Sequence, residues 1–414
     1  MLVLACVAVF VGMSLSRISP AHPASQQLVR WGANFGPLTL GGQWWRLLSS
    51  VFLHIGIVHL AVNMWCLWDL GSFAERLYGR ATFLAIFLMT GIAGAMFSLL
   101  WHPFAIEAGA SGAIFGIAGA LMASFFLGHE RLPRDAGKGA LLSIVAFAAY
   151  NLFIGAISSG AGNAAHIGGL VFGFAIGLLL ARFGYSRRVL AASALALILG
   201  GAPLARARGY VVPAEQGRTA LAAGHTDAAI RSLNDSVRRN PNYAEGYFML
   251  AQAYMQKQQY PAAEAAYRRA LALDPSARDV RYQLGMALVA QSRAKEALET
   301  FRELARRDPA SSDAQMGIGT AAMIAGDYQL AVDAYRRATK LDPANPQPWT
   351  NLGLAALQLR QYDEAIAAFS KCVDLQPDSS GPLLNLAIAY KARGMDQEAQ
   401  ETYRRAQELL PKEK

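Results

Sequence analysis

Two residues able to perform nucleophilic chemistry lie 55 positions apart, each in strongly apolar surroundings. Ser111 belongs to the sequence Gly-Ala-Ser-Gly at 109–112 and opens an apolar run with no charged residue before Glu130. His166 opens a second apolar run, which stays uncharged up to Arg182. Ionisable and polar residues are costly inside lipid, and they mark functional sites there. A serine hydroxyl becomes a nucleophile when a neighbouring base accepts its proton, so this pair predicts acyl-transfer chemistry.

The elements that must position this pair are apolar segments long enough to be considered as membrane spans. Seven of them precede residue 205: 2–15, 47–70, 82–101, 111–127, 139–157, 164–181 and 189–204. The first is short, and a cleaved signal peptide is its alternative interpretation, but it lacks the basic start of a signal and a spanning helix is favoured. Basic residues gather in alternate loops, which the positive-inside rule assigns to the cytoplasm: Arg76, Arg80, Arg131, Arg134, Lys138, Arg182, Arg187 and Arg188.

This topology brings several polar residues to one depth. Ser111 and His166 begin inward-running helices at the outer surface, and the second segment carries His54, His59 and Asn63 in its outer half. His59 and Asn63 are four residues apart and share one helical face. The Ser111 backbone N–H, the His59 ring and the Asn63 amide are therefore the expected donors to an oxyanion. No carboxylate is placed to orient His166, because Asp69 and Glu75 lie toward the cytoplasmic end of the second helix and Glu107 lies in a loop, so a Ser–His dyad is predicted.

Close approach of the two helices is predicted from their small residues. Gly112 and Gly116 follow Ser111, and Gly169 and Gly173 follow His166, each pair four residues apart. Such spacing lets membrane helices pack backbone to backbone, which by itself is ordinary helix packing. Because these glycines directly follow the proposed nucleophile and base, their spacing also predicts the helix contact that brings Ser111 to His166.

Residues 40–183 resemble the rhomboid family of intramembrane serine proteases. The resemblance rests on Trp45-Arg46, His54, His59-Leu-Ala-Val-Asn63, Glu75-Arg76, Gly109-Ala-Ser111-Gly112 and Ala165-His166-Ile-Gly168-Gly169. It implies that Ser111 is the nucleophile and His166 the general base, with His59 and Asn63 in the oxyanion hole and Gly109 and His54 in support. It also implies an active site open outward, reached by single-pass membrane substrates through a gate between helices two and five, without metal or cofactor. Taken singly, His54 and His59 each have a packing histidine as the alternative interpretation, His59 less so. Phe115 stands where some members have a tyrosine beside the histidine.

Other classes of protein fit the pattern less well. An α/β-hydrolase would need a strand before the Gly-x-Ser motif, where an outer loop is expected here. A transporter would place its polar site near the middle of the membrane rather than near one surface. A rhomboid-like scaffold that binds membrane helices without cutting them and recruits partners through its second half is the alternative function.

The second half of the chain contains a repeat of 34 residues. Prolines recur at Pro241, Pro275, Pro309, Pro343, Pro377 and Pro411. Alanine recurs in phase at Ala229, Ala263, Ala297, Ala331, Ala365 and Ala399, each followed four residues later by leucine or an aromatic residue. This is the tetratricopeptide (TPR) pattern, in which paired antiparallel helices stack into an α-solenoid whose concave face binds a peptide or protein.

The composition of the two halves fits this division. Residues 1–210 hold 13 Lys/Arg and 5 Asp/Glu, whereas residues 211–414 hold 25 and 24, so the net charge of +9 belongs to the membrane half. That distribution favours membrane orientation over nucleic-acid binding. The three cysteines have no metal-ligand spacing.

We therefore expect an all-α protein with a rhomboid-type helical bundle at 1–205, made of a six-helix core and a seventh helix, and six TPR units at 206–414. The expected location is the bacterial cytoplasmic (inner) membrane. Seven spans place the repeats on the periplasmic side, and six would place them in the cytoplasm.

Overall fold

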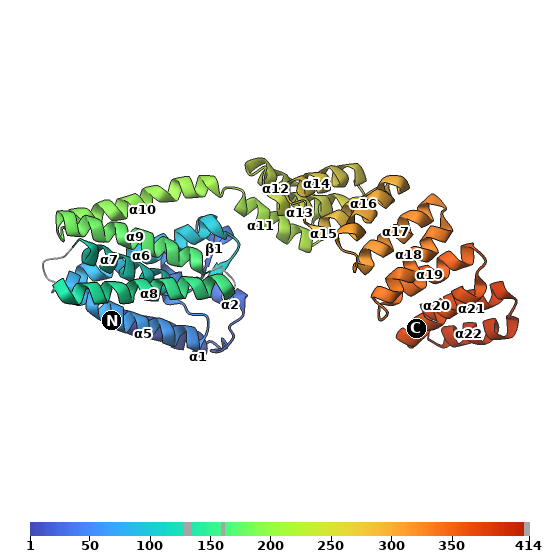
Figure 1. Cartoon of the computed structure of the whole chain (residues 1–414), viewed down its shortest axis with the longest axis horizontal. Helices are drawn as coiled ribbons and strands as arrows, with labels where there is room; N and C mark the ends of the chain where they lie inside the picture. Colours follow the sequence, from blue (N-terminus) through green and yellow to red (C-terminus); the bar gives the residue numbers. More distant parts are fainter. Residues whose placement is uncertain (128–133, 159–161, 410–414) are drawn as a thin grey trace. The chain divides into compact units, whose positions relative to one another are not determined.

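The computed structural model describes residues 1–127, 134–158 and 162–409, without the side chains of 134–138 and 158 (Figure 1). The described chain is almost wholly helical, as predicted, and it divides into two compact units, Met1–Glu215 and Gln216–Lys414. Each unit has its own buried core. Below we call them the membrane unit and the repeat unit.

The membrane unit contains ten α-helices and two very short strands among its described residues before α11. The larger helices are α1 (Leu2–Leu15), α5 (Ile57–Tyr78), α6 (Arg80–Trp101), α7 (Ser111–Phe126), α8 (Arg134–Ser158), α9 (Asn163–Phe183) and α10 (Arg187–Ala207). The shorter elements are α2 (Ser25–Trp31), β1 (Asn34–Phe35), α3 (Gly36–Thr39), α4 (Arg46–Ser49), the 3-10 helix η1 (Ser50–Phe52) and β2 (Ile106–Glu107).

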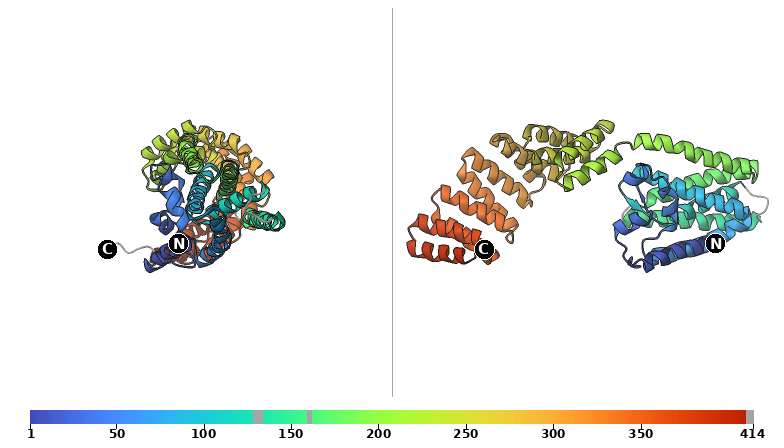
Figure 2. Two further views of the ribbon diagram at one scale, coloured as in Figure 1. Left: turned by 90° about the vertical axis from the view of Figure 1, so that its left-hand side faces the viewer. Right: turned by 180° about the vertical axis from the view of Figure 1, so that it is seen from behind.

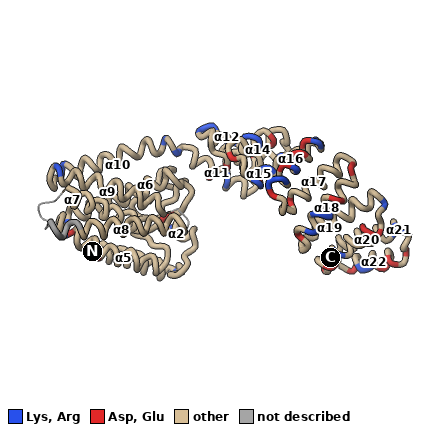
Figure 3. The backbone as a smooth tube through the Cα atoms, in the orientation of Figure 1, with Lys and Arg blue, Asp and Glu red and all other residues tan. Residues whose placement is uncertain are grey.

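Within the described residues, five helices are long and apolar enough to cross a membrane: α5, α6, the 139–157 part of α8, α9 and α10. The apolar helices α1 and α7 are shorter. Charged residues are sparse along these helices, whereas the repeat unit carries residues of both signs throughout (Figure 3). Together with the five long apolar helices, this is the composition of a multi-pass membrane protein.

The second apolar segment differs from the prediction. It was expected to be one helix over 47–70, but residues 46–52 form α4 and η1, and α5 begins only at Ile57. Gly56 has φ +92°, and a side chain there would lie 2.8 Å from the carbonyl oxygen of Ala21. The Ile57 N–H donates to the Pro20 carbonyl oxygen at 2.8 Å. The loop is thus fixed by a distant segment, and His54 lies before the helix rather than on it.

Helix α7 forms the centre of the membrane unit. Ile117, Ala118, Ala120 and Leu121 are fully buried, and the helix packs along α6 and α9 with α5 and α8 also in contact (Figures 1 and 2). Alanine and glycine on α7 permit this close packing, because small residues let helix backbones approach. The first residue of this central helix is Ser111.

Two short strands fix the chain that leads into α7. In the antiparallel pair β1–β2, Asn34 lies opposite Glu107 and Phe35 opposite Ile106. The Asn34 side chain donates to the Ala95 carbonyl oxygen on α6 at 3.2 Å and accepts from the Thr39 hydroxyl at 2.8 Å. The segment just before Ser111 is therefore held by a part of the chain more than 70 residues away.

The repeat unit, with the helix that leads into it, is a series of antiparallel helix pairs. The first helices of the pairs are α11 (Val211–Ala222), α13 (Ala244–Gln256), α15 (Arg278–Ala290), α17 (Ser312–Ala325), α19 (Pro346–Gln358) and α21 (Ser380–Arg393). The second helices are α12 (Thr226–Arg239), α14 (Tyr260–Leu273), α16 (Ala294–Arg307), α18 (Tyr328–Leu341), α20 (Tyr362–Leu375) and α22 (Asp396–Glu408). The predicted final proline, Pro411, lies outside the described residues.

The repeated residues form the contacts between helices. All six phased alanines are buried, and the large residue four positions later fills the space beside the preceding helix. A side chain at Gly353 would lie 2.5 Å from the Phe369 ring, so the ring packs directly on the backbone of α19. Tyr403, in the last pair, is the exception and is 51% exposed.

Candidate active site

Ser111 and His166 are in direct contact. Ser111 is the first residue of α7, and His166 is in the first turn of α9. The His166 Nε2 and the Ser111 Oγ are 2.9 Å apart, which is hydrogen-bond distance. With the hydroxyl donating, the imidazole can accept the serine proton without moving.

Glycines on α9 set the distance between the two helices. A side chain at Gly169 would lie 2.0 Å from the Gly112 carbonyl oxygen, and one at Gly173 would lie 2.0 Å from the Gly116 carbonyl oxygen. Both are far below any real contact of a Cβ atom, so the backbones touch at these points. Gly116 itself also faces α6, where its missing side chain leaves room for Thr90. The predicted glycines therefore bring α7 to both of its neighbours.

The His166 ring is held by packing rather than by an acid. Its plane lies parallel to the Phe115 ring, with an interplanar angle of 2° and centroids 4.3 Å apart. Its Nδ1 is buried and has no hydrogen-bond partner among the described residues. This arrangement is a dyad in which Phe115 fixes the orientation of the imidazole.

His59 offers a hydrogen-bond donor beside Ser111. Its Nδ1 accepts the Ile55 N–H at 3.3 Å, so a neutral ring carries its proton on Nε2. That nitrogen is 3.2 Å from the point where a Gly109 side chain would begin, and the same point is 3.8 Å from the Ser111 Oγ. Gly109 has φ +148°. A glycine here therefore leaves the space between His59 and Ser111 open.

His54 and Asn63 both contact His59. His54 is fully buried, and its ring is tilted by 58° against the His59 ring at a centroid distance of 5.4 Å. The Asn63 amide donates to the His59 carbonyl oxygen at 2.8 Å, and Asn63 is not among the described residues that line the cavity around Ser111. In this arrangement, both residues support His59.

A cavity of about 310 Å³ surrounds the Ser–His pair. Its wall includes the pair itself, His59, Gly109, Ser50 and Glu107. The first turn of α7 also borders it, and N–H groups in the first turn of a helix have no acceptor within the helix. An oxyanion beside Ser111 would thus meet backbone N–H groups at the positive end of a helix dipole.

Glu107 is the site residue that sequence reasoning missed. The sequence predicts a loop at this position, whereas Glu107 lies on β2 and lines the cavity. Burial raises its pKa from 4.5 to about 7, and a hydrogen bond with Ser98 acts in the opposite direction. The available signal was its position four residues before Ser111 in a chain with few acids, but the strand pairing that turns it inward depends on residue 34.

A second cavity of about 390 Å³ lies between α5 and α8. Val62, Trp65 and Asp69 line it from α5, and Phe147 and Tyr150 line it from α8. Many apolar side chains around it face outward: Trp65 is 74% exposed, and Tyr150 is 65% exposed. The two helices that the family resemblance implicates in substrate entry are therefore separated by a space within the membrane unit.

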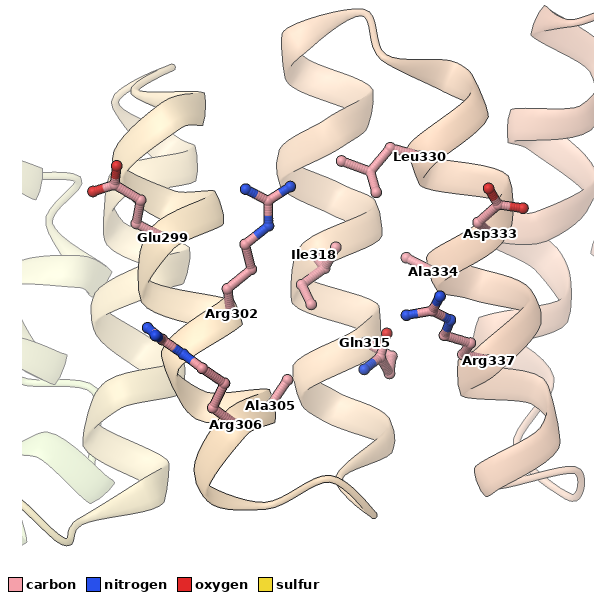
Figure 4. Close-up of a pocket in the computed structure, with 10 residues that line it drawn as sticks. All are labelled: Glu299, Arg302, Ala305, Arg306, Gln315, Ile318, Leu330, Asp333, Ala334 and Arg337. Carbon is pink, nitrogen blue, oxygen red and sulfur yellow. The ribbon is translucent and has the colours of Figure 1, made fainter.

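In the repeat unit, a groove of about 600 Å³ lies among α16, α17 and α18 (Figure 4). Ile318 and Leu330 belong to its apolar lining, and Arg302 and Arg337 extend into it from the two flanking helices. On either side of this groove, the second helices of adjacent repeat pairs are linked by ion pairs, such as Arg336 of α18 with Glu364 of α20 at 2.9 Å. No ion pair links α16 to α18 in the described part of the chain, and an open groove lies at this junction.

Metal binding has no support in the side-chain geometry. Within residues 1–127, 134–158 and 162–409, no group of three or more His, Cys, Asp or Glu residues could hold a metal ion. The polar groups around Ser111 are suited to proton transfer and to hydrogen bonding.

Comparison with known proteins assigns the membrane unit. The family model of the rhomboid domain matches residues 41–183. Rhomboid protease GluP of Bacillus subtilis is 39% identical over 190 residues, covering 45% of this chain and 36% of GluP. Rhomboid protease AarA of Providencia stuartii is 35% identical over 182 residues, covering 39% of this chain and 64% of AarA. The rhomboid-family protein YdcA of Bacillus subtilis is 32% identical over 164 residues, covering 39% of this chain and 78% of YdcA.

The chain belongs to the rhomboid family of serine proteases and carries a C-terminal TPR region. It spans between 36% and 64% of the length of the first three curated relatives it matches. Residues 186–414 match a family described as the cilia and flagella-associated protein 70 C-terminal domain. The family and the TPR repeats predicted from the sequence are thereby confirmed.

Solved structures similar to the chain include two helical proteins. YrrB, described as a TPR protein with an unusual peptide-binding site, has a TM-score of 0.36 and 23% identity, covering 44% of this chain and 93% of YrrB. PilW, a type IV pilus biogenesis factor, has a TM-score of 0.44 and 20% identity, covering 50% of this chain and 96% of PilW.

Proposed function

We propose that this protein is an intramembrane serine endopeptidase that cleaves single-pass membrane proteins in or near their transmembrane segment. The observation that carries the proposal is the 2.9 Å contact between the Ser111 Oγ and the His166 Nε2 at the wall of a cavity. A hydroxyl hydrogen-bonded to an imidazole beside free N–H donors is the constellation required for acyl transfer.

The reaction follows from these positions. His166 takes the proton of Ser111 as its Oγ attacks the carbonyl carbon of the substrate peptide bond. The resulting oxyanion accepts hydrogen bonds from the first-turn N–H groups of α7 and from the His59 Nε2. His166 then gives its proton to the leaving amine, and the acyl-enzyme is hydrolysed when His166 activates a water molecule in the same way. Asn63 would join the donors after its amide turns from the His59 carbonyl oxygen.

Substrates would enter laterally between α5 and α8. The cavity between these helices and the exposed apolar residues around it support this route. A transmembrane helix hides its peptide bonds in its own hydrogen bonds, so a substrate segment must unwind before Ser111 can attack it. Unwinding is easier where small residues weaken the helix.

The repeat unit would recruit a peptide or protein partner. TPR solenoids present extended surfaces of this kind, the concave face above all, and the groove among α16, α17 and α18 is a further recess. We place the protein in the bacterial cytoplasmic membrane with α10 as a seventh span, which puts the repeats on the periplasmic side. Labelling of Cys372 in intact cells and in spheroplasts permeabilised with mild detergent tests the side, with 2 M urea present because this thiol is buried.

The activity is tested with the full chain in proteoliposomes and a panel of single-pass substrates. We expect cleavage by the wild type and none by Ser111→Ala or His166→Ala, because each removes one half of the dyad. Ser14→Ala, which removes a serine of α1 outside the cavity, is the matched control and should cleave normally. Substrate binding without any Ser111-dependent product would overturn the protease proposal in favour of a membrane scaffold.

A further inference from the structure

Glu107 presents an unused acceptor at the catalytic cavity. It lines the cavity that contains Ser111, and its Oε1 is buried without a hydrogen-bond partner among the described residues. A buried carboxylate oxygen that has lost water and gained no partner is costly to keep. A group that enters the cavity with a donor would remove this cost.

The carboxyl is held in place by its backbone. Glu107 pairs with Asn34 in the β1–β2 register, and Asn34 is bonded through its side chain to α6. Ser98 on the same helix hydrogen-bonds the Glu107 carboxyl. A side chain fixed in this way presents Oε1 at a defined point of the wall.

Glu107 is also the only acidic residue among the described residues of this wall, where the other ionisable groups are His59 and His166. It lies four residues before Ser111, a distance that an extended chain spans in at most about 14 Å. A substrate threaded past Ser111 would therefore bring a side chain within about four residues of the cleaved bond to Glu107.

We propose that Glu107 is a specificity-determining residue that selects substrates with a lysine or arginine within four residues of the cleaved bond. The inference rests on the proposed protease function. A cation donates charge-assisted hydrogen bonds to a carboxylate, which are about twice as strong as neutral ones. The raised pKa of Glu107 agrees with a carboxyl that lacks its counter-charge in the empty site.

The test uses a single-pass substrate in which one position at a time, up to four residues on either side of the cleaved bond, is Lys, Met or Glu. At the substrate position whose side chain reaches Glu107, we expect the wild-type kcat/KM for Lys to exceed that for Met by about tenfold. This is the ratio expected for one charge-assisted hydrogen bond. Glu107→Gln should reduce this ratio to about twofold or less, and Glu107→Lys should favour the Glu substrate. Glu75→Gln, an acid of the same unit outside the cavity, should keep the wild-type ratio.

Fluorophosphonate labelling of Ser111 distinguishes a failure of the Glu107 specificity role from a failure of the proposed protease function. A labelled, active wild type with equal rates for Lys and Met at every position overturns the specificity role of Glu107 and leaves the protease intact. An unchanged ratio in a labelled Glu107→Gln protein does the same. A wild type that neither labels nor cleaves overturns both, and because the wild-type ratio alone can decide, the test does not depend on the variants folding.

Discussion

The contact between α7 and α9 can be tested by adding one methyl group at Gly173. In Gly173→Ala the new Cβ would lie 2.0 Å from the Gly116 carbonyl oxygen, where real Cβ atoms essentially never come closer than 3.0 Å. The two helices must therefore separate by about 1 Å. A displacement of that size at a catalytic pair costs about 100-fold in rate. Overpacking of this kind also destabilises a protein by about 1–3 kcal/mol.

The assay compares kcat/KM for a single-pass substrate with the apparent Tm of the membrane unit in the same detergent. The control is Gly139→Ala on α8, where a side chain would meet nothing within 4 Å, and it should leave both values unchanged. We expect the Ser111–His166 distance of 2.9 Å to lengthen beyond hydrogen bonding in Gly173→Ala, with activity falling far more than stability. Wild-type activity in this variant would refute the argument that backbone contact positions the dyad.

Three further predictions follow from the same structure. Phe115→Ala removes the ring stacked on His166, and kcat/KM should fall by up to about tenfold, since aromatic pairs contribute about 0.5–1.5 kcal/mol, while Phe115→Tyr should stay near wild type; equal rates for all three proteins would exclude an orienting role. Because burial raises the pKa of Glu107 from 4.5 to about 7, the folded state binds the extra proton between these values, so stability is full below pH 4.5 and is lost as pH rises to 7, by about 3 kcal/mol at most; tryptophan fluorescence, which reports the membrane unit because six of seven tryptophans lie there, should show this loss in the wild type and not in Glu107→Gln. Phe369→Ala should destabilise the repeat unit by about 3–5 kcal/mol in denaturant titrations followed by circular dichroism, whereas Tyr403→Ala, at the same repeat position but 51% exposed, should change it by less than about 0.5 kcal/mol; equal effects would contradict the packing described.

The sequence was sufficient for features that depend on residue periodicity or on the order of charged and apolar segments along the chain. A 34-residue recurrence of alanine and proline requires stacked helix pairs, and loop charges with apolar lengths place Ser111 and His166 at one depth. The contact between these two residues follows from that topology and from the glycines behind them. The all-helical fold predicted on these grounds is confirmed, as is the rhomboid family, which was predicted from the resemblance of its motifs.

The sequence was insufficient where distant segments decide local structure. The sequence predicts a helix at His54, but α5 begins only after Gly56, which has φ +92°. The Ile57 N–H donates to the Pro20 carbonyl oxygen, so a distant segment decides where this helix starts. Glu107 is predicted in a loop, because local sequence does not show a strand that forms only by pairing with Asn34. The side-chain bond of Asn63 to the His59 carbonyl oxygen is a local choice among rotamers that spacing alone does not fix.

The Ser111–His166 dyad is tested most directly by the site of covalent reaction in the full chain. The protein in proteoliposomes is treated with a fluorophosphonate and digested, and the adduct is located by peptide mass spectrometry. We expect an adduct on Ser111 that forms in the wild type and is lost in His166→Ala. Absence of the adduct, its presence on another serine, or its undiminished formation in His166→Ala would contradict a Ser111–His166 dyad.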